Sequence, residues 1–242
     1  MIEPLEYIVM ILLPGYQYLP QINPDEWVDN LLGAFVSDFF IVPSVALVIA
    51  VFRLRLVWSV IFAIGFMGIE WLFLSLGIYK HFWWQTIYTG IGIFIYFCIG
   101  KKIWAYTQNI ERKNFIIIIY FFLLYLMLNG RSTFFLVHLL HIVKFHIGWF
   151  NNPTRDHMAF AGLFNEMTAL LLTISFMLKR YYRWVGIFLL VLLDCVLYKW
   201  NILQTASIWY LIVVILGQFG IIFFTYWMVQ FLQKKSRLAS DK

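Results

Sequence analysis

Five charged side chains interrupt the long apolar runs of this sequence and are its most informative candidates for chemistry: Asp38, Glu70, Arg131, Glu166 and Asp194. An ionisable group inside a membrane is costly unless it is paired, protonated or hydrated, so each is a candidate functional residue. Four acids and a single Arg would leave a surplus of three negative charges if all ionised. We therefore expect some of these acids to be protonated near neutral pH or to hold a cation.

Buried carboxyl groups of this kind are suited to acid–base chemistry. A carboxylic acid that burial keeps protonated can act as a general acid on an apolar substrate. Glu70 and Glu166 are the candidates for this catalytic role, with Asp38 or Asp194 as the base or as a stabiliser of a cation. The alternative is structural, because Arg131 could pair with one or two of the acids and clamp helices together.

Two histidines extend this polar cluster, since His138 and His141 are i, i+3 neighbours that follow Arg131. Such a pair could bind a metal if carboxylates completed the coordination shell. No HExxH, Glu-x-x-His, phosphate-binding glycine loop, GxSxG or CxxC motif accompanies them. Hydrogen-bonded or interfacial histidines are therefore favoured over a metal site, and the sequence identifies no cofactor.

The elements that must position these residues are transmembrane helices, because 63% of the 242 residues are hydrophobic and 12% are charged. A bilayer-spanning helix needs about 20 mostly apolar residues. Seven runs meet this need and predict an all-α, polytopic membrane bundle: Leu32 to Phe52, Leu56 to Leu76, Trp84 to Ile99, Phe115 to Leu136, Met158 to Leu178, Trp184 to Asn201 and Ser207 to Leu232. Asn129 to Ser132 interrupt the fourth run, so a broken helix is an alternative there.

Basic residues set the expected orientation, because 13 of the 18 Lys and Arg residues fall in loops on one side of the predicted spans. The positive-inside rule then places the N-terminus outside and the C-terminus in the cytoplasm. The aromatic residues Tyr79, Trp83 and Trp84 fall at outer span ends, as in an interfacial belt. Since the basic residues flank apolar runs instead of forming one patch, nucleic acid is not an expected partner.

Three regions follow from this pattern. Residues 1–31 are predicted as an extracytoplasmic segment with a short interfacial helix, residues 32–232 as the seven-helix transmembrane domain, and residues 233–242 as a basic cytoplasmic tail. The sequence shows no internal repeat, so the two halves common in secondary transporters are not expected.

Depth along the predicted spans brings the charged residues together. At 1.5 Å per residue, Asp38 and Glu70 lie about 9 Å below the outer surface, and the other three lie roughly 8 to 12 Å below it. A lipid-facing position is expensive for any of them. We therefore expect most of the five to line one cavity that opens outward.

The stretch from Gly68 to Tyr88, GIEWLFLSLGIYKHFWWQTIY, joins two predicted spans through a Glu-Trp pair, a Leu-Gly turn and a Tyr-x-His arrangement. It resembles a family of small, uncharacterised polytopic membrane proteins found in spore-forming Firmicutes. The resemblance covers Asp38 to Tyr106. It implies a bacterial plasma membrane and carries no known activity.

Three functions compete at this point. The chain could bind a lipid-like or cationic ligand, or a partner membrane protein, in the polar cavity. It could be an enzyme that uses buried carboxylates on a lipid or isoprenoid. It could also be part of a proton- or cation-coupled transporter. The first is ranked slightly ahead, because no catalytic motif is present.

Overall fold

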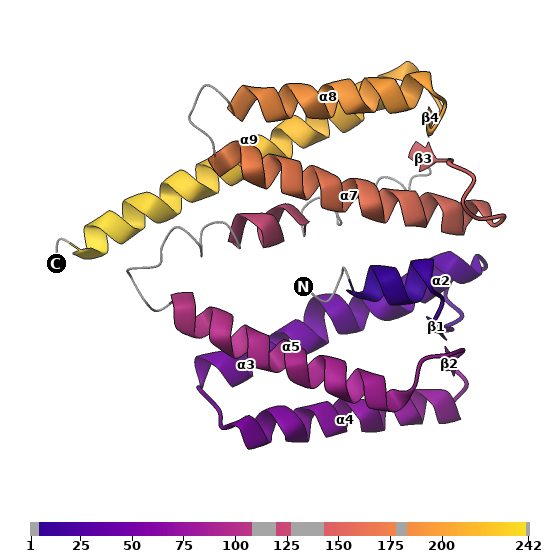
Figure 1. Cartoon of the computed structure of the whole chain (residues 1–242), viewed down its shortest axis with the longest axis vertical. Helices are drawn as coiled ribbons and strands as arrows, with labels where there is room; N and C mark the ends of the chain where they lie inside the picture. Colours follow the sequence, from indigo (N-terminus) through magenta and orange to yellow (C-terminus); the bar gives the residue numbers. More distant parts are fainter. Residues whose placement is uncertain (1–4, 108–119, 127–142, 178–182, 241–242) are drawn as a thin grey trace. The chain divides into compact units, whose positions relative to one another are not determined.

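The structure of the protein is a computed structural model, and it describes residues 5–107, 120–126, 143–177 and 183–240 (Figure 1). These residues are mostly helical, as the all-α prediction requires, and the strands among them have three residues each. The chain divides into two compact units, Met1–Ile117 and Ile118–Lys242. The sequence-predicted boundaries at residues 32 and 233 stay predictions.

The first unit begins with a short π-helix and a strand and continues into long helices. Its elements are η1 (Tyr7–Leu12), β1 (Tyr16–Tyr18), α2 (Glu26–Val36), η2 (Ser37–Ile41), α3 (Val42–Val51), α4 (Leu56–Ser75), β2 (Tyr79–His81) and α5 (Thr86–Thr107). Helix α5 packs against both α3 and α4. Val42, Ala46, Ile49 and Phe97 form the core of this packing.

Helix α2, the π-turn η2 and α3 form one continuous helix, since the backbone stays helical through both junctions. The side chain of Asp25 caps its start by accepting hydrogen bonds from the backbone N–H groups of Trp27 and Val28. The wider π-turn comes just before Pro43, which has no N–H to donate and whose ring crowds the preceding turn. The helix thus begins six residues before the apolar run that predicted it, because its first turns are polar.

The second unit has the elements β3 (Val143–Phe145), α7 (Pro153–Met177), α8 (Arg183–Lys199), β4 (Leu203–Thr205) and α9 (Ile208–Ser240). Helix α8 packs against α7 and α9. Residues 120–126 are also helical and contribute Phe121, Tyr125 and Leu126 to a core shared with Leu172 and Leu190. The predicted fourth span, Phe115 to Leu136, lies largely outside the described residues, and the predicted basic tail continues α9 as far as Ser240.

Four helical stretches are long and apolar enough to cross a membrane: Glu26–Val51, Leu56–Ser75, Thr86–Tyr106 and Pro153–Ser175. A shorter apolar stretch, Ile208–Phe224, lies in α9. Large apolar side chains project from the helices, for example Trp71, Phe188 and Phe223, which are 70, 66 and 73% exposed. Exposed apolar surface on this scale is costly in water and is satisfied by lipid.

The two units have the same element order, strand, helix, helix, strand, helix, which the sequence does not predict. In each unit the two strands pair antiparallel across the intervening helices. Their registers match, since Tyr18 lies opposite Tyr79 in the first unit and Phe145 lies opposite Leu203 in the second. This correspondence is visible in the structure and not in the sequence.

A buried aspartate holds the loop after the first strand in both units. Asp29 accepts hydrogen bonds from the backbone N–H groups of residues 21, 22 and 23. Asp156 does the same for residues 147, 148, 149 and 150. The next residue, Asn30 or His157, accepts a hydrogen bond from the last strand residue, at 2.8 Å in each case. One offset of 127 residues relates all these pairs except the additional bond from residue 147.

Backbone conformation repeats as well. In the first loop, Gln21 and Gly148 have positive φ angles of 60° and 81°. At the end of the second long helix, Gly77 and Asn201 have positive φ angles of 72° and 62°. Glycine and asparagine are favoured in this left-handed region. Both units therefore turn the chain at the same two places, with different residue types.

Candidate ligand-binding site

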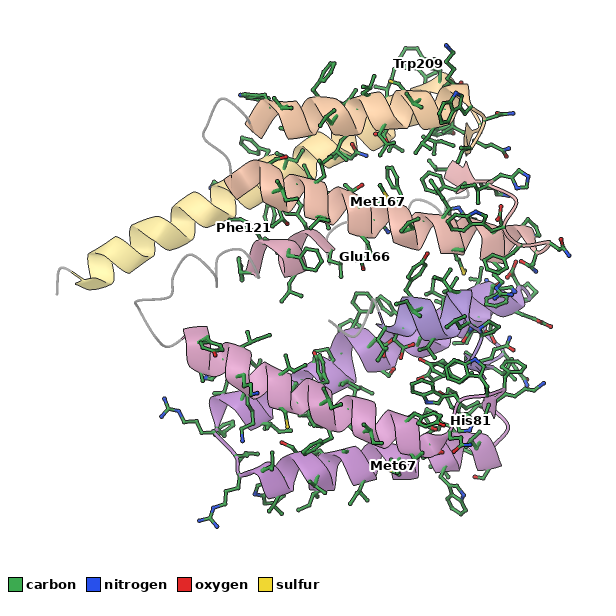
Figure 2. All side chains as sticks on the ribbon, viewed as in Figure 1. Met67, His81, Phe121, Glu166, Met167 and Trp209 are labelled. Atoms are coloured by element: carbon green, nitrogen blue, oxygen red, sulfur yellow. The ribbon has the colours of Figure 1, made fainter. Side chains whose placement is uncertain are left out.

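Aromatic side chains gather on the strand pair β1–β2 of the first unit. The Tyr16 ring lies 5.3 Å from the Tyr79 ring and 5.6 Å from the Trp84 ring, centroid to centroid. The Tyr18 ring lies 4.7 Å from the Tyr79 ring, edge to face. Figure 2 shows His81 beside these crowded rings, where α4 has ended and α5 is about to begin.

These rings form part of the wall of a cavity of about 270 Å³ within the first unit. Most of the lining is apolar and comes from η1, η2, α4 and α5. Three carboxyl groups interrupt it: Glu6, Asp38 and Glu70. The lining includes no Lys or Arg among the residues that the structure describes. Its charge is therefore negative wherever its acids ionise.

Glu6 reaches the cavity from the N-terminal turn and shares a hydrogen bond with Tyr16, whose hydroxyl donates to Glu6 Oε2. Burial raises the pKa of Glu6 to about 7, against the lowering effect of the Tyr16 hydrogen bond and with a further rise from Glu70. Burial also raises the pKa of Tyr16 well above its usual value. The phenol therefore keeps its proton and acts as a donor, while Glu6 gains and loses a proton near neutral pH.

Glu70 lies on α4 and is 7% exposed. Its Oε1 is 2.8 Å from Nε2 of His81, on β2. The His81 ring meets the Tyr79 ring edge to face at 5.3 Å. Because the strand pair fixes His81, the imidazole holds the Glu70 carboxylate at the aromatic end of the cavity.

Asp38 enters the cavity from the π-turn η2, where Ser37 Oγ donates a hydrogen bond of 2.8 Å to Asp38 Oδ1. An extra residue in a π-turn changes the face on which the following side chains lie, and such turns are frequent at functional sites. The irregular turn thus accounts for a carboxylate in the wall of an otherwise apolar helix.

Of the five charged residues expected to share one outward-opening cavity, the structure brings two together, since Asp38 and Glu70 both line this cavity. Glu166 on α7 and Asp194 on α8 belong to the second unit, so a single cavity for all the acids stays a prediction. Arg131, His138 and His141 lie outside the described residues.

Sequence reasoning missed Glu6 and the buried tyrosines. It assigned Tyr79 and Trp84 to an interfacial belt, whereas Tyr79 is buried at 6% exposure and both line the cavity. The run from Glu6 to Leu13 carried a signal, since a lone acid followed by seven largely apolar residues is unusual in an exposed segment. The strand pairing gave none, because only three residues of each strand take part.

Metal binding has no support in the described part of the chain, where no group of three or more His, Cys, Asp or Glu side chains is placed to hold an ion. The described histidines instead have polar neighbours. His157 Nδ1 accepts the Phe145 N–H, and His146 Nδ1 lies 3.2 Å from Asp156 Oδ2.

Comparison with known proteins gives no further guide, since no family model, no curated protein and no solved structure matches this chain.

Proposed function

We propose that this chain is a seven-span protein of the bacterial plasma membrane whose first unit binds a small organic cation with an apolar body. The four apolar helices support a membrane location. The uneven distribution of Lys and Arg supports an outside N-terminus and a cytoplasmic C-terminus. Single cysteines at Lys80 and Arg55 in a cysteine-free background test this orientation, since only the first should react with an impermeant maleimide in intact cells.

One observation carries the choice of ligand: three acids, eight aromatic residues and no Lys or Arg line one apolar cavity in the described chain. A cation offsets the negative charge of the acids, which is costly to bury alone. The faces of Tyr and Trp rings attract cations, and aromatic cages commonly recognise quaternary ammonium groups. The hydrocarbon part of the ligand fills the remaining wall.

Alternative occupants fit this wall less well. A neutral lipid tail would gain no charge–charge attraction from the acids of the lining, and an anionic lipid headgroup would be repelled by those that ionise. A partner helix would present mainly apolar side chains and would bring no charge opposite to that of the acids. The cation satisfies both parts of the lining.

The test uses two ligands of the same shape and different charge. Benzyltrimethylammonium is a cation, and neopentylbenzene is its neutral counterpart. With protein in lipid nanodiscs, we expect saturable binding of the radiolabelled cation and at least about tenfold weaker competition by the neutral compound. Equal affinities for the two would contradict the proposal.

Substitution of Glu70 locates the site. Glu70→Gln should weaken binding of benzyltrimethylammonium about tenfold or more, because it removes a buried charge and keeps the shape. Glu26→Gln is the matched control, since Glu26 is exposed at the start of α2 and lies outside the lining. Asp38→Asn is the second variant, for use if Glu70→Gln unfolds at a lower temperature than the parent. Unchanged affinity in both folded variants would exclude this cavity.

A second candidate function is acid–base catalysis on a lipid-like substrate, and Glu6 favours it. A carboxyl group with a pKa of about 7 is half protonated at neutral pH, as a general acid requires. In that case the lipid extract of cells carrying the chain should differ from that of cells carrying Glu6→Gln. Identical extracts would leave ligand binding as the function of the cavity.

A further inference from the structure

The structural repeat pairs two buried acids that lie in different units. Glu70 is on α4, seven residues before the positive-φ residue Gly77, and Asp194 is on α8, seven residues before Asn201. The helix ends that follow have matching backbone bonds, with Ile78 N–H donating to the Phe73 carbonyl and Ile202 N–H to the Leu197 carbonyl. Asp194 therefore occupies in the second unit the position that Glu70 occupies in the first.

The surroundings of the two acids differ. Glu70 is bound by His81 at the end of β2. The residue at the corresponding position of β4 is Thr205, which has no charge. Asp194 is 1% exposed, and neither carboxylate oxygen has a hydrogen bond of normal geometry to the described residues. The side-chain amide of Gln218, on α9, is close enough to interact with it.

The elements packed against α8 supply no counter-ion to Asp194 among the described side chains. Arg155 at the start of α7 lies over the Phe150 ring, 3.8 Å from its centroid. His157 accepts a backbone hydrogen bond from Phe145, and Asp156 is bound to its own loop. Lys199 is exposed at the far end of α8. The remaining described titratable groups on these elements are Glu166, Cys195, Tyr198, Tyr210 and the tyrosines of residues 120–126, and α7 adds only neutral polar side chains, namely Thr154, Asn165, Thr168, Thr173 and Ser175.

A carboxylate in such a place would be a buried charge without a counter-ion among the described residues, which is an unfavourable arrangement in a protein interior. Proton uptake removes that charge. It also creates one O–H donor, which matches the carbonyl oxygen of an amide side chain such as that of Gln218.

We propose that Asp194 is a proton-binding site, a carboxylic acid that is neutral near neutral pH and has Gln218 as its hydrogen-bond partner. The chain then carries two carboxyl groups at equivalent positions in the two units, in different surroundings. Glu70 is held by a histidine beside a cavity, and Asp194 holds a proton in a closed core. This site is independent of cation binding in the first unit.

Infrared spectroscopy of the protein in nanodiscs tests the proposal, because a protonated carboxyl group has a carbonyl absorption that a carboxylate lacks. Because Glu6 is itself partly protonated near neutral pH, the spectra are compared in a Glu6→Gln background, where we expect this band near neutral pH and its loss when Asp194→Asn is added. Glu166→Gln is the matched control, since Glu166 is also an intramembrane acid of the second unit but is only partly buried. A Glu6→Gln spectrum without the band, or a band that Asp194→Asn leaves intact, would overturn the proposal.

Chemical labelling gives a second readout that does not depend on a substituted protein. Dicyclohexylcarbodiimide is apolar and reacts with protonated carboxyl groups, and peptide mass spectrometry locates the adduct. We expect modification at Asp194 near neutral pH and none at the exposed Glu26. Modification confined to acidic conditions would show a carboxylate at neutral pH and would overturn the proposal, whether or not the first unit binds a cation.

Discussion

The two units build the same backbone frame and line it with different chemistry. Tyr16, Tyr18 and Tyr79 of the first unit occupy the strand positions that Val143, Phe145 and Leu203 occupy in the second. The tyrosines line a cavity with three acids, whereas the second set is part of a hydrophobic core. The backbone of each strand pair is held by main-chain hydrogen bonds, so it accommodates tyrosines in one unit and Val, Phe and Leu in the other. A ligand site can therefore be gained or lost on the strand pair without a change of fold.

The largest expected loss of stability concerns the buried aspartate that holds the loop after the first strand in each unit. Asp29→Ala and Asp156→Ala should each lower the free energy of unfolding by about 4 kcal/mol, because each leaves three or four backbone N–H groups without an acceptor. Unfolding in mixed micelles measures the change. Asp29→Asn and Asp156→Asn are the controls, since an amide retains one acceptor oxygen and should cost less. A loss in one unit alone would show that the repeat is not held in the same way.

The next largest effect is a pH dependence of stability that comes from Glu6, in the acidic cavity of the first unit. The folded-state pKa of Glu6, about 7, lies above its ordinary value of 4.5. Between these pH values the unfolded chain binds fewer protons than the folded chain, so stability falls as the pH rises. The contribution is fully present below about 4.5 and is lost by about 7, with a slope of at most about 1.4 kcal/mol per pH unit.

Glu6→Gln should flatten this part of the stability curve, because an amide does not titrate. The readout is the free energy of unfolding at a series of pH values in mixed micelles. Glu26→Gln, which changes an exposed acid of the same unit, should leave the slope unchanged. A slope that persists in Glu6→Gln would assign the pH dependence to another group.

The smallest expected loss of stability concerns Asn30 and His157, two residue types with the same role. Asn30 and His157 each accept a backbone N–H from a strand end. Removal of either acceptor by Ala should cost about 1 to 2 kcal/mol, the penalty for one buried donor without a partner. Asn30→His and His157→Asn test whether the roles are interchangeable. If the exchanged variants are as unstable as the Ala variants, ring or amide packing outweighs the hydrogen bond.

The sequence predicted the helices because apolar runs are a local pattern. Apolar runs located α4 almost to the residue, and helical rise placed Asp38 and Glu70 at one depth. The sequence could not predict the strand pairs, since each joins three residues to a segment about 60 positions away. Glu6 was missed because its burial depends on the cavity wall that α4 and α5 supply, far along the chain.

The repeat escaped sequence analysis because the matching positions keep a role and not a residue type. Asp29 and Asp156 are identical, but Asn30 corresponds to His157 and Gln21 to Gly148. Backbone acceptors and positive-φ positions can each be supplied by several residue types. In two strings of mostly apolar residues, a few such positions do not stand out.

The pairing of β1 with β2 also sets an order of events during synthesis. Tyr16 to Tyr18 leave the ribosome first, and their partners Tyr79 to His81 follow only after two helices have been made. The entropy cost of closing such a loop rises only slowly with its length. The three residues of β1 have no strand partner until the chain has been made as far as β2. A chain stalled before Tyr79 would lack this strand pair, and the α5 wall of the cavity is made later still, so the pocket is among the last features of the first unit to form.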